Sequence, residues 1–525
     1  MRFNKPVTNT INFGGDRAFN LPIDLELYSL ICTSMLSGTF YTPNTNDLLN
    51  RIKSRIRKVD PEYVAKLAIY ARENMYLRSI PMVLAVELAK IHKGDSLVRK
   101  LVSRIVQRAD EITELLAYYV KANSRSNENK SKIRSDMYEI PKVLFGLSKQ
   151  IQKGLAQSFT KFDEYQFAKY NRDAEIKLRD AMRITHPRPL NDEMSSLFKK
   201  ILTNTLSTPY TWETELSKAG QESRNKKEVW EELIDSRKVG YMAVLRNLRN
   251  ILQADVSEGH IEKVAQYISN TKAIEVSKQL PFRFLSAYRV LVGEPIRRWS
   301  GDDRKEELPS SQKLSIILEA LEDAVKTSVK NIPMFMNENV LIATDVSGSM
   351  QCSVSSKSVV QNFDIGTMLA MLLRHKCATA TAGMFGDTWK VVNFPGDNIL
   401  YNANEIHKRE GEVGYSTNGW KVLDWACKSS ERYDRIMIFT DCQLWDSTGA
   451  HQGRGAMNKF WTIYKEKNPN SKLYLFNLQP YGTSPIDLLD KNVSLISGWS
   501  DKIFNVLDGI EKGKEALEEI NKIEL

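Results

Sequence analysis

The residue types most able to do chemistry stand in a short run in the last third of the chain. Asp345, Ser347 and Ser349 form a DxSxS motif directly after an apolar stretch. A carboxylate and two hydroxyls at alternate positions can turn toward one point. Thr417, on a glycine-flanked loop, offers a third hydroxyl, and Asp441 offers a second carboxylate. Such an all-oxygen set suits Mg²⁺ or Mn²⁺, with water or a ligand oxygen completing the octahedron.

A plainer interpretation of the DxSxS motif is a capped turn at the start of a helix. Thr417 and Asp441, in the right order along the chain, favour the metal site. An enzymatic interpretation is weaker, because the serines lack the GxSxG elbow of a nucleophile. A hydroxyl-rich single-metal site also lacks the carboxylate cluster typical of two-metal phosphodiester cleavage. We therefore expect a binding site and no enzyme.

The elements that position these residues alternate between strands and helices. After Ile332-Pro333, short runs of strand formers are separated by helical stretches. The expected strands are Val340–Thr344, Ala378–Phe385, Arg435–Thr440 and Lys472–Leu478. This alternation predicts a doubly wound, mostly parallel α/β sheet. Ligands bind such sheets beyond the carboxyl ends of the strands, so the loops after Thr344 and Thr440 are expected to meet there.

The preceding two thirds of the chain follow a helical pattern from about Leu25 to Val329. Apolar residues recur at i, i+3, i+4 and i+7, as in Val64–Ala71 behind a capping Asp60-Pro61. Many amphipathic helices with little strand signal predict a stacked α-solenoid. An irregular bundle stays open, because no sharp period is evident. The expected organisation is multi-domain, with helices in residues 1–337 and the α/β domain in residues 338–525.

Charge divides along the same boundary. The 525-residue chain carries a formal net charge of +10. Residues 1–337 hold 54 Lys and Arg against 41 Asp and Glu, whereas residues 338–525 hold 20 against 23. The excess of positive charge in the helical part suggests a polyanionic partner, most often nucleic acid. A solubilising surface is the alternative.

Two basic segments are candidate RNA contacts. In the first, Arg72 and Arg78 alternate with Tyr70 and Tyr76. The second gathers five cationic or titratable side chains within 13 residues: Lys177, Arg179, Arg183, His186 and Arg188. Because Pro187 disfavours helix at the residue before it, we expect His186 at a helix end. Cations there can contact phosphates, and planar His and Arg side chains can stack on unpaired bases. A solvated charged helix is the alternative.

Composition places the chain among ordinary globular proteins. Its hydrophobic content is 42% and its mean hydropathy is −0.38. No run of 18 apolar residues is present, and the first residues lack the apolar core of a signal peptide. Five cysteines without CxxC spacing argue against a disulfide framework or a zinc ribbon. We expect a cytoplasmic protein with reduced thiols and no membrane contact.

Taken together, these segments resemble the TROVE module of the Ro ribonucleoprotein autoantigen family, followed by a von Willebrand factor A domain. The stretches ARENMYLRSIPMVLAVELA (71–89) and RITHPRP (183–189) match the TROVE motifs. The DxSxS motif with Thr417 and Asp441 resembles a metal-ion-dependent adhesion site, in which hydroxyls bind directly and aspartates largely through water. Asn418 departs from the many relatives that carry an acidic residue there. The resemblance covers roughly residues 10–525.

The resemblance implies HEAT-like helical repeats that close into a ring. Single-stranded 3′ ends of misfolded structured RNA enter the hole, and Y-type noncoding RNAs bind the basic outer surface. Lys177, Arg183, His186 and Arg188 are implied to lie on that outer surface, and Arg72 and Arg78 are candidates for the hole. The implied function is a monomeric, non-enzymatic RNA-binding scaffold, with an exoribonuclease or another protein as a further candidate partner. The alternative is a metal-dependent protein adhesion scaffold in which RNA is secondary.

Overall fold

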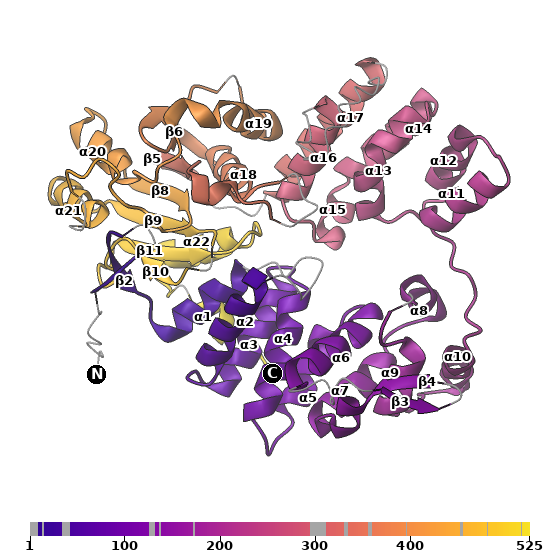
Figure 1. The fold of residues 1–525 in the computed structure, drawn as a ribbon. Coiled ribbons are helices and arrows are strands. Elements are labelled where there is room, and N and C mark those ends of the chain that lie inside the picture. Colours follow the sequence, from indigo (N-terminus) through magenta and orange to yellow (C-terminus); the bar gives the residue numbers. More distant parts are fainter. Residues whose placement is uncertain are drawn as a thin grey trace. The chain divides into compact units, whose positions relative to one another are not determined.

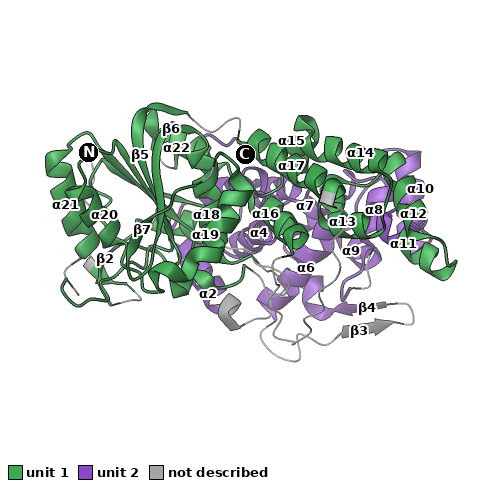
Figure 2. Cartoon of the chain, turned by 90° about the horizontal axis from the view of Figure 1, so that it is seen from above, with its two compact units in different colours: residues 1–34, 216–518 green, residues 35–215, 519–525 purple. Residues whose placement is uncertain are grey.

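The computed structural model describes residues 9–12, 15–33, 43–124, 132–135, 138–171, 174–293, 311–329, 334–354, 360–394, 396–451, 455–479, 481–515 and 517–525. The chain forms two compact units, shown in Figure 2. Unit 1 contains residues 1–34 and 216–518, and unit 2 contains residues 35–215 and 519–525. This division differs from the expected boundary between residues 337 and 338. The expected change of character at Ile332-Pro333 lies outside the described residues.

A six-stranded sheet forms the α/β part of unit 1 (Figure 1). Its order is β11-β9-β8-β5-β6-β7, and every neighbouring pair is parallel except β6 and β7. The predicted doubly wound sheet is thereby confirmed, with one short antiparallel edge strand that the sequence pattern did not indicate. The strands are β5 (Phe335–Asp345), β6 (Cys377–Phe385), β7 (Trp389–Val391), β8 (Arg435–Thr440), β9 (Lys472–Asn477) and β11 (Val493–Ser497).

Helices cover both faces of this sheet because its strand residues alternate between two apolar faces. Leu341, Ile436 and Leu473 point to one face and join a buried cluster with the helices α20 and α21. On the other face, Phe439 and Phe476 stack at 4.3 Å between ring centroids, near α18 and α22. The helices are α18 (Asn362–Arg374), α19 (Ile399–Arg409), α20 (Trp420–Lys428), α21 (Ala456–Lys467) and α22 (Ile503–Glu511).

The first residues of the chain belong to this α/β part, which accounts for the place of residues 1–34 in unit 1. Strand β2 (Arg17–Asn20) pairs with β1 (Asn9–Ile11) and with β10 (Thr483–Ser484). Helix α1 (Ile23–Cys32) packs beside β11, and the Tyr28 hydroxyl donates to the Ser497 carbonyl oxygen at 2.8 Å. The N-terminal segment is therefore held by residues more than 450 positions away.

The remaining helices follow the predicted amphipathic pattern. Those of unit 2 are α2 (Pro43–Ile56), α3 (Pro61–Glu73), α4 (Ser79–Ile91), α5 (Leu97–Ile105), α6 (Asp110–Asn123), α7 (Lys149–Phe159), α8 (Glu164–Tyr170), α9 (Leu178–Thr185) and α10 (Asp192–Thr203), with the short α23 (Glu518–Asn521) at the end of the chain. A hairpin of β3 (Lys132–Ser135) and β4 (Tyr138–Pro141) interrupts them. Helix α11 (Trp212–Gln221) spans the boundary between the units. Unit 1 adds α12 (Lys226–Asp235), α13 (Tyr241–Gln253), α14 (Glu258–Ser269), α15 (Thr271–Ser277), α16 (Phe282–Val292) and α17 (Ser311–Ser328). None of the described helices has the length and apolar character needed to cross a bilayer.

Candidate functional site

The ends of strands β5 and β8 bring the two predicted carboxylates to one edge of the sheet. These strands are parallel neighbours with Thr344 opposite Phe439, so Asp345 and Asp441 follow at the same edge. Both aspartates are fully buried. The Thr440 hydroxyl donates to Asp345 Oδ2 at 2.6 Å, which fixes one carboxylate against the neighbouring strand.

The three predicted hydroxyls lie in the loops around these carboxylates. The Ser347 backbone N–H donates to Asp345 Oδ1 at 3.0 Å, and the Ser347 and Ser349 hydroxyl oxygens are 3.3 Å apart. The Thr417 hydroxyl donates to the Gln443 carbonyl oxygen at 3.3 Å. The Gln443 backbone N–H in turn donates to Asp441 Oδ1 at 2.9 Å. The structure therefore connects Thr417 to Asp441 through a residue that sequence reasoning missed.

A backbone contact joins the two hydroxyl-bearing loops. The Gly348 N–H, at the start of the 3-10 helix Gly348–Gln351, donates to the Tyr415 carbonyl oxygen at 2.9 Å. Tyr415 stands two residues before Thr417, so this bond draws the glycine-flanked loop toward the serines. This bond fixes the two loops beside one another, although about 70 residues of sequence separate them.

The electrostatics of the two aspartates fit a cation. Burial, together with the charge of Asp441, raises the pKa of Asp345 to about 7. Burial likewise raises the pKa of Asp441. Asp441 Oδ2 is buried and has no hydrogen-bond partner among the described residues, and leaving a buried acceptor unsatisfied costs free energy. Two buried carboxylates with one orphaned oxygen, beside three hydroxyls, form a hard oxygen donor set that suits Mg²⁺ or Mn²⁺.

Asn418 has a framework role that explains its place next to Thr417. Its amide nitrogen donates to the Asp387 carbonyl oxygen at 3.2 Å and to the Ser447 hydroxyl at 2.7 Å. Its amide oxygen accepts from the Ser447 N–H at 2.9 Å and from the Trp420 indole at 3.2 Å. A carboxylate at this position could not donate, so the amide is matched to this buried setting.

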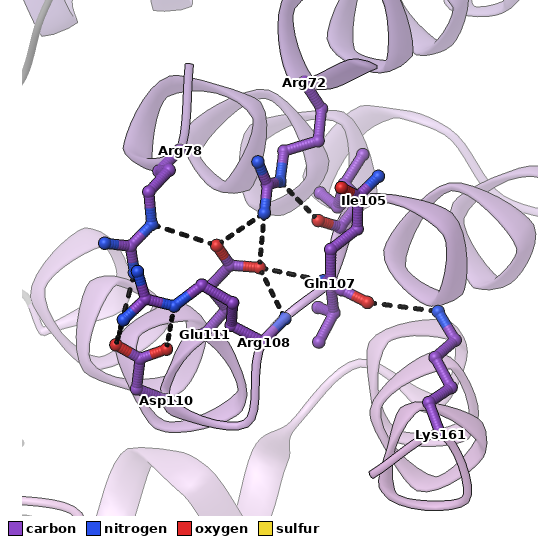
Figure 3. Close-up of polar contacts among 9 residues, drawn as sticks. Arg72, Arg78, Ile105, Gln107, Arg108, Asp110, Glu111 and Lys161 are labelled. Atoms are coloured by element: carbon purple, nitrogen blue, oxygen red, sulfur yellow. Dashed lines mark hydrogen bonds and ion pairs between the residues drawn. The ribbon is translucent and has the colours of Figure 1, made fainter. Parts of the chain in front are cut away.

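Arg72, predicted as an RNA contact, lies inside the fold of unit 2 (Figure 3). Its side chain donates to Glu111 Oε1 and Oε2 at 2.8 and 3.1 Å and to the Ile105 carbonyl oxygen at 3.0 Å. Only 8% of Arg72 is exposed. The structure thus corrects the prediction for Arg72, because a buried guanidinium that already binds a carboxylate is not available to a phosphate.

Arg78 belongs to the same charged network but reaches the surface. Its Nε donates to Glu111 Oε1 at 3.1 Å and its Nη2 to Asp110 Oδ2 at 3.2 Å. Arg108 also binds Asp110, at 2.8 Å from Nη2, and Lys161 Nζ donates to the Val106 carbonyl oxygen (Figure 3). The network holds the end of α3 and the start of α4 against the start of α6. Arg78 is therefore first a structural residue, although 41% of its side chain is exposed.

The second basic segment forms α9 and the turn after it. The apolar side of α9 is buried, with Leu178, Ala181 and Met182 each less than 5% exposed. The helix ends at Thr185, and His186 takes the left-handed conformation with φ of 51°, which confirms its predicted place at a helix end.

The five candidate side chains of this segment differ in exposure. His186 and Arg188 are exposed. The side chains of Lys177, Arg179 and Arg183 are partly buried, and Arg179 Nε lies 3.8 Å from Asp180 Oδ1. Arg188 is thus the most accessible cation of the segment, two residues from the exposed ring of His186.

Comparison with known proteins gives matches along most of the chain. The model of the TROVE domain matches residues 33–207 and 203–294, and the model of the Ro60 vWA domain matches residues 339–510. Telomerase protein component 1 of Rattus norvegicus is 24% identical over 345 residues, and that of Mus musculus is 25% identical over 346 residues. Each match covers 50% of this chain but only 12% of the relative, so the chain corresponds to a small part of those proteins.

A solved structure shares the fold. The crystal structure of the Deinococcus radiodurans RO (RSR) protein superposes with a TM-score of 0.59 at 14% sequence identity. The match covers 94% of this chain and 100% of that one. At this identity the likeness speaks for the fold alone, and it includes both the helices and the α/β part.

Proposed function

Because the chain belongs to the Ro family, in which a TROVE domain is joined to a von Willebrand factor A domain, we propose that it is an RNA-binding scaffold without catalytic activity. The observation that carries the proposal is the excess of 54 Lys and Arg over 41 Asp and Glu in residues 1–337, the part that contains the TROVE matches. The exposed Arg188 supplies a cation in the same part, and the exposed ring of His186 lies two residues before it.

In this proposal, RNA is held mainly by its backbone. Arg188 contacts phosphate, and the exposed ring of His186 stacks on an unpaired base. The RNAs we propose are Y-type noncoding RNA on the outer surface and the single-stranded 3′ ends of misfolded structured RNA in the hole of a ring of helical repeats. A hole of that kind admits a single strand and excludes a duplex, which gives selectivity by shape. Neutralised phosphates release counterions, so affinity falls with salt.

Filter binding of the full-length chain tests the proposal. The probes are one RNA duplex with a single-stranded 3′ tail and the same duplex with blunt ends, each measured at several salt concentrations. We expect tighter binding of the tailed duplex and a loss of affinity at higher salt. Equal affinity for the two probes with little salt dependence would refute capture of single-stranded ends.

A second candidate function rests on the metal site. Asp345, Ser347, Ser349, Thr417 and Asp441 would hold Mg²⁺ or Mn²⁺, and the orphaned oxygen of Asp441 favours this assignment. Such an ion, when bound, supplies positive charge and an open coordination position for a carboxylate oxygen of a partner. We propose that the partner is a protein, such as an exoribonuclease, so that one chain presents RNA and a protein ligand together.

Isothermal titration separates the metal proposal from the RNA proposal. We expect the full-length protein to bind Mg²⁺ or Mn²⁺ and Asp345→Ala to lose this binding, while RNA affinity is retained. A partner bound through the metal should be captured only with the ion, resist nuclease treatment, and be lost in Asp345→Ala. Metal-dependent cleavage of RNA that Asp345→Ala abolishes would instead show that the protein is an enzyme.

A further inference from the structure

A cavity of about 460 Å³ lies among helices α12, α13 and α14 of unit 1. Contacts between α12 and α14 and between α13 and α14 form its walls, and Figure 1 shows the three helices side by side. Its volume falls within the range of roughly 300–1,000 Å³ that small-molecule sites occupy. Neither the metal site nor the two basic segments include any residue of this cavity, so a function for it is still to be assigned.

The deep part of the cavity is apolar. Trp230 and Leu233 on α12, Val244 on α13 and Val264 on α14 line it, and none of them is more than 5% exposed. These side chains offer no charge and, apart from the Trp230 indole N–H, no hydrogen-bonding group. The deep part therefore suits a flat, weakly polar ring system whose polar edge lies at the mouth of the cavity.

The mouth of the cavity carries an aromatic ring and an amide. Tyr267 is 37% exposed, and the edge-to-face contact of its ring with Tyr241, at 5.6 Å between centroids, holds it in place. Gln266, beside it on α14, is exposed and also lines the cavity. A tyrosine face can stack on a nucleobase, and a side-chain amide can pair with its donor and acceptor edge.

The charges at the mouth favour an anionic ligand backbone. Arg237 follows α12 in the left-handed conformation, with φ of 52°, and is exposed. Within the described parts of the chain its guanidinium meets no carboxylate. Lys263 also lines the mouth, where its ammonium group binds Asp235 at 2.6 Å. Two cations against one carboxylate leave net positive charge where a phosphate flanking a buried base would lie.

We propose that this cavity binds one unpaired nucleobase of an RNA strand, with Arg237 and Lys263 on the adjoining phosphates. The inference rests on the proposed RNA binding and adds to it a site for a single nucleotide. Stacking and an amide contact accept more than one base, so the site selects unpaired nucleotides over paired ones. A base within a duplex cannot enter, because its edge and both faces are already occupied.

The test compares the double variant Arg237→Ala/Gln266→Ala with the control Arg246→Ala in the full-length protein. Arg246 is an exposed arginine of α13 that does not line the cavity. Single-stranded RNA, a blunt duplex and uridine monophosphate serve as probes. We expect the double variant to bind single-stranded RNA at least about 5-fold more weakly, since it loses one charge-assisted phosphate contact and one hydrogen bond to the base while Tyr267 stays in place. The control should lose less, and both variants should keep the melting temperature of the wild type.

Photo-cross-linking identifies the contact directly. A single strand containing 4-thiouridine should cross-link to the peptide that contains Tyr267. Unchanged affinity of the double variant for single-stranded RNA, or cross-links confined to other peptides, would overturn the inference while leaving the proposed function intact. Binding of uridine monophosphate that the double variant weakens, with RNA affinity unchanged, would also overturn it, because a free nucleotide would then be the ligand. Absence of all RNA binding in the wild type would refute the proposed function and this site with it.

Discussion

The charged network around Glu111 predicts a large and local loss of stability when its carboxylate is removed. Glu111 is 1% exposed and accepts hydrogen bonds from Arg72 and Arg78. It also accepts from the backbone N–H groups of Gln107 and Arg108, at 2.8 and 3.1 Å. Among the described residues, Glu111→Ala would leave the buried Arg72 guanidinium with only the Ile105 carbonyl oxygen as a hydrogen-bond acceptor in this network, and it would leave two backbone donors without their acceptor. Removing one partner of a buried ion pair costs about 3–5 kcal/mol.

Substitution of the other partner, Arg72, is expected to lower the stability less. Arg72→Met removes the buried charge and fills most of its volume, while Glu111 keeps Arg78 and the two backbone donors. We therefore expect Arg72→Met to lose about half as much stability as Glu111→Ala. This order follows from the number of partners that each variant leaves unsatisfied. It does not depend on the absolute strength of the ion pair.

Hydrogen exchange of the full-length protein measures the effect where it arises. A two-unit chain does not unfold in one step, so exchange of the amides in residues 105–116 is more informative than a global melting curve. A loss of about 3–5 kcal/mol in stability corresponds to amide exchange that is roughly two to nearly four orders of magnitude faster in Glu111→Ala than in the wild type. Exchange less than about tenfold faster, or a larger effect in Arg72→Met, would refute the structural role assigned to this network.

Three further predictions concern the other sites. Mg²⁺ at a concentration a hundredfold above its dissociation constant should stabilise the wild type by about 2.7 kcal/mol. In thermal melting, Asp345→Asn should show no such gain. An equal gain in the variant would contradict the metal assignment. Arg188→Ala should lower RNA affinity and reduce the slope of log affinity against log salt by about 0.7, with unchanged melting temperature; an unchanged slope would exclude a phosphate contact. Burial raises the pKa of Asp364, yet hydrogen bonds and charge from His407 and Arg289 hold it below its ordinary value. Its carboxylate therefore stabilises the fold above the unfolded pKa of about 3.9 and loses this effect as the pH falls through the lower folded value. Asp364→Asn should accordingly melt lower than the wild type at pH 7, with a difference that shrinks below pH 4; a constant difference would contradict this.

The positions of Asp345 and Asp441 were predictable because strand ends place them. The alternation of apolar runs and helices fixes a parallel sheet, and the position of Asp345 and Asp441 directly after two strands then puts both at one edge. The contributions of Thr440 and Gln443 were missed, although Thr440 ends the same strand that precedes Asp441. A strand-terminal hydroxyl next to a carboxylate is the signal that could have indicated the first of these.

The structural role of Arg72 could not be predicted from its neighbours in sequence. Arginines alternating with tyrosines occur both on RNA-binding faces and inside packed helices. The deciding partner, Glu111, lies 39 residues away on another helix. Likewise, the strand Arg17–Asn20 is short and its partner Thr483–Ser484 lies more than 460 residues along the chain. Local periodicity carries no information about pairing across such distances.

The N-terminal segment has a consequence for biosynthesis. Helix α1 is made early, but the residues that cover its apolar side include Ser497, and Tyr28 finds its hydrogen-bond partner there only 469 residues later. At translation rates of roughly 5–20 residues per second, about 25 to 90 seconds pass between the synthesis of α1 and that of Ser497. During this interval the apolar side chains of Leu27, Leu30 and Ile31, which are buried in the folded protein, lack this part of their native surroundings. Unit 2 likewise includes residues made late, because Lys66 Nζ donates to the Asn521 carbonyl oxygen at 3.1 Å. Both units are thus incomplete until residues 497–521 have been synthesised, and we expect the folding yield in the cell to depend on chaperones that shield α1 in the interval.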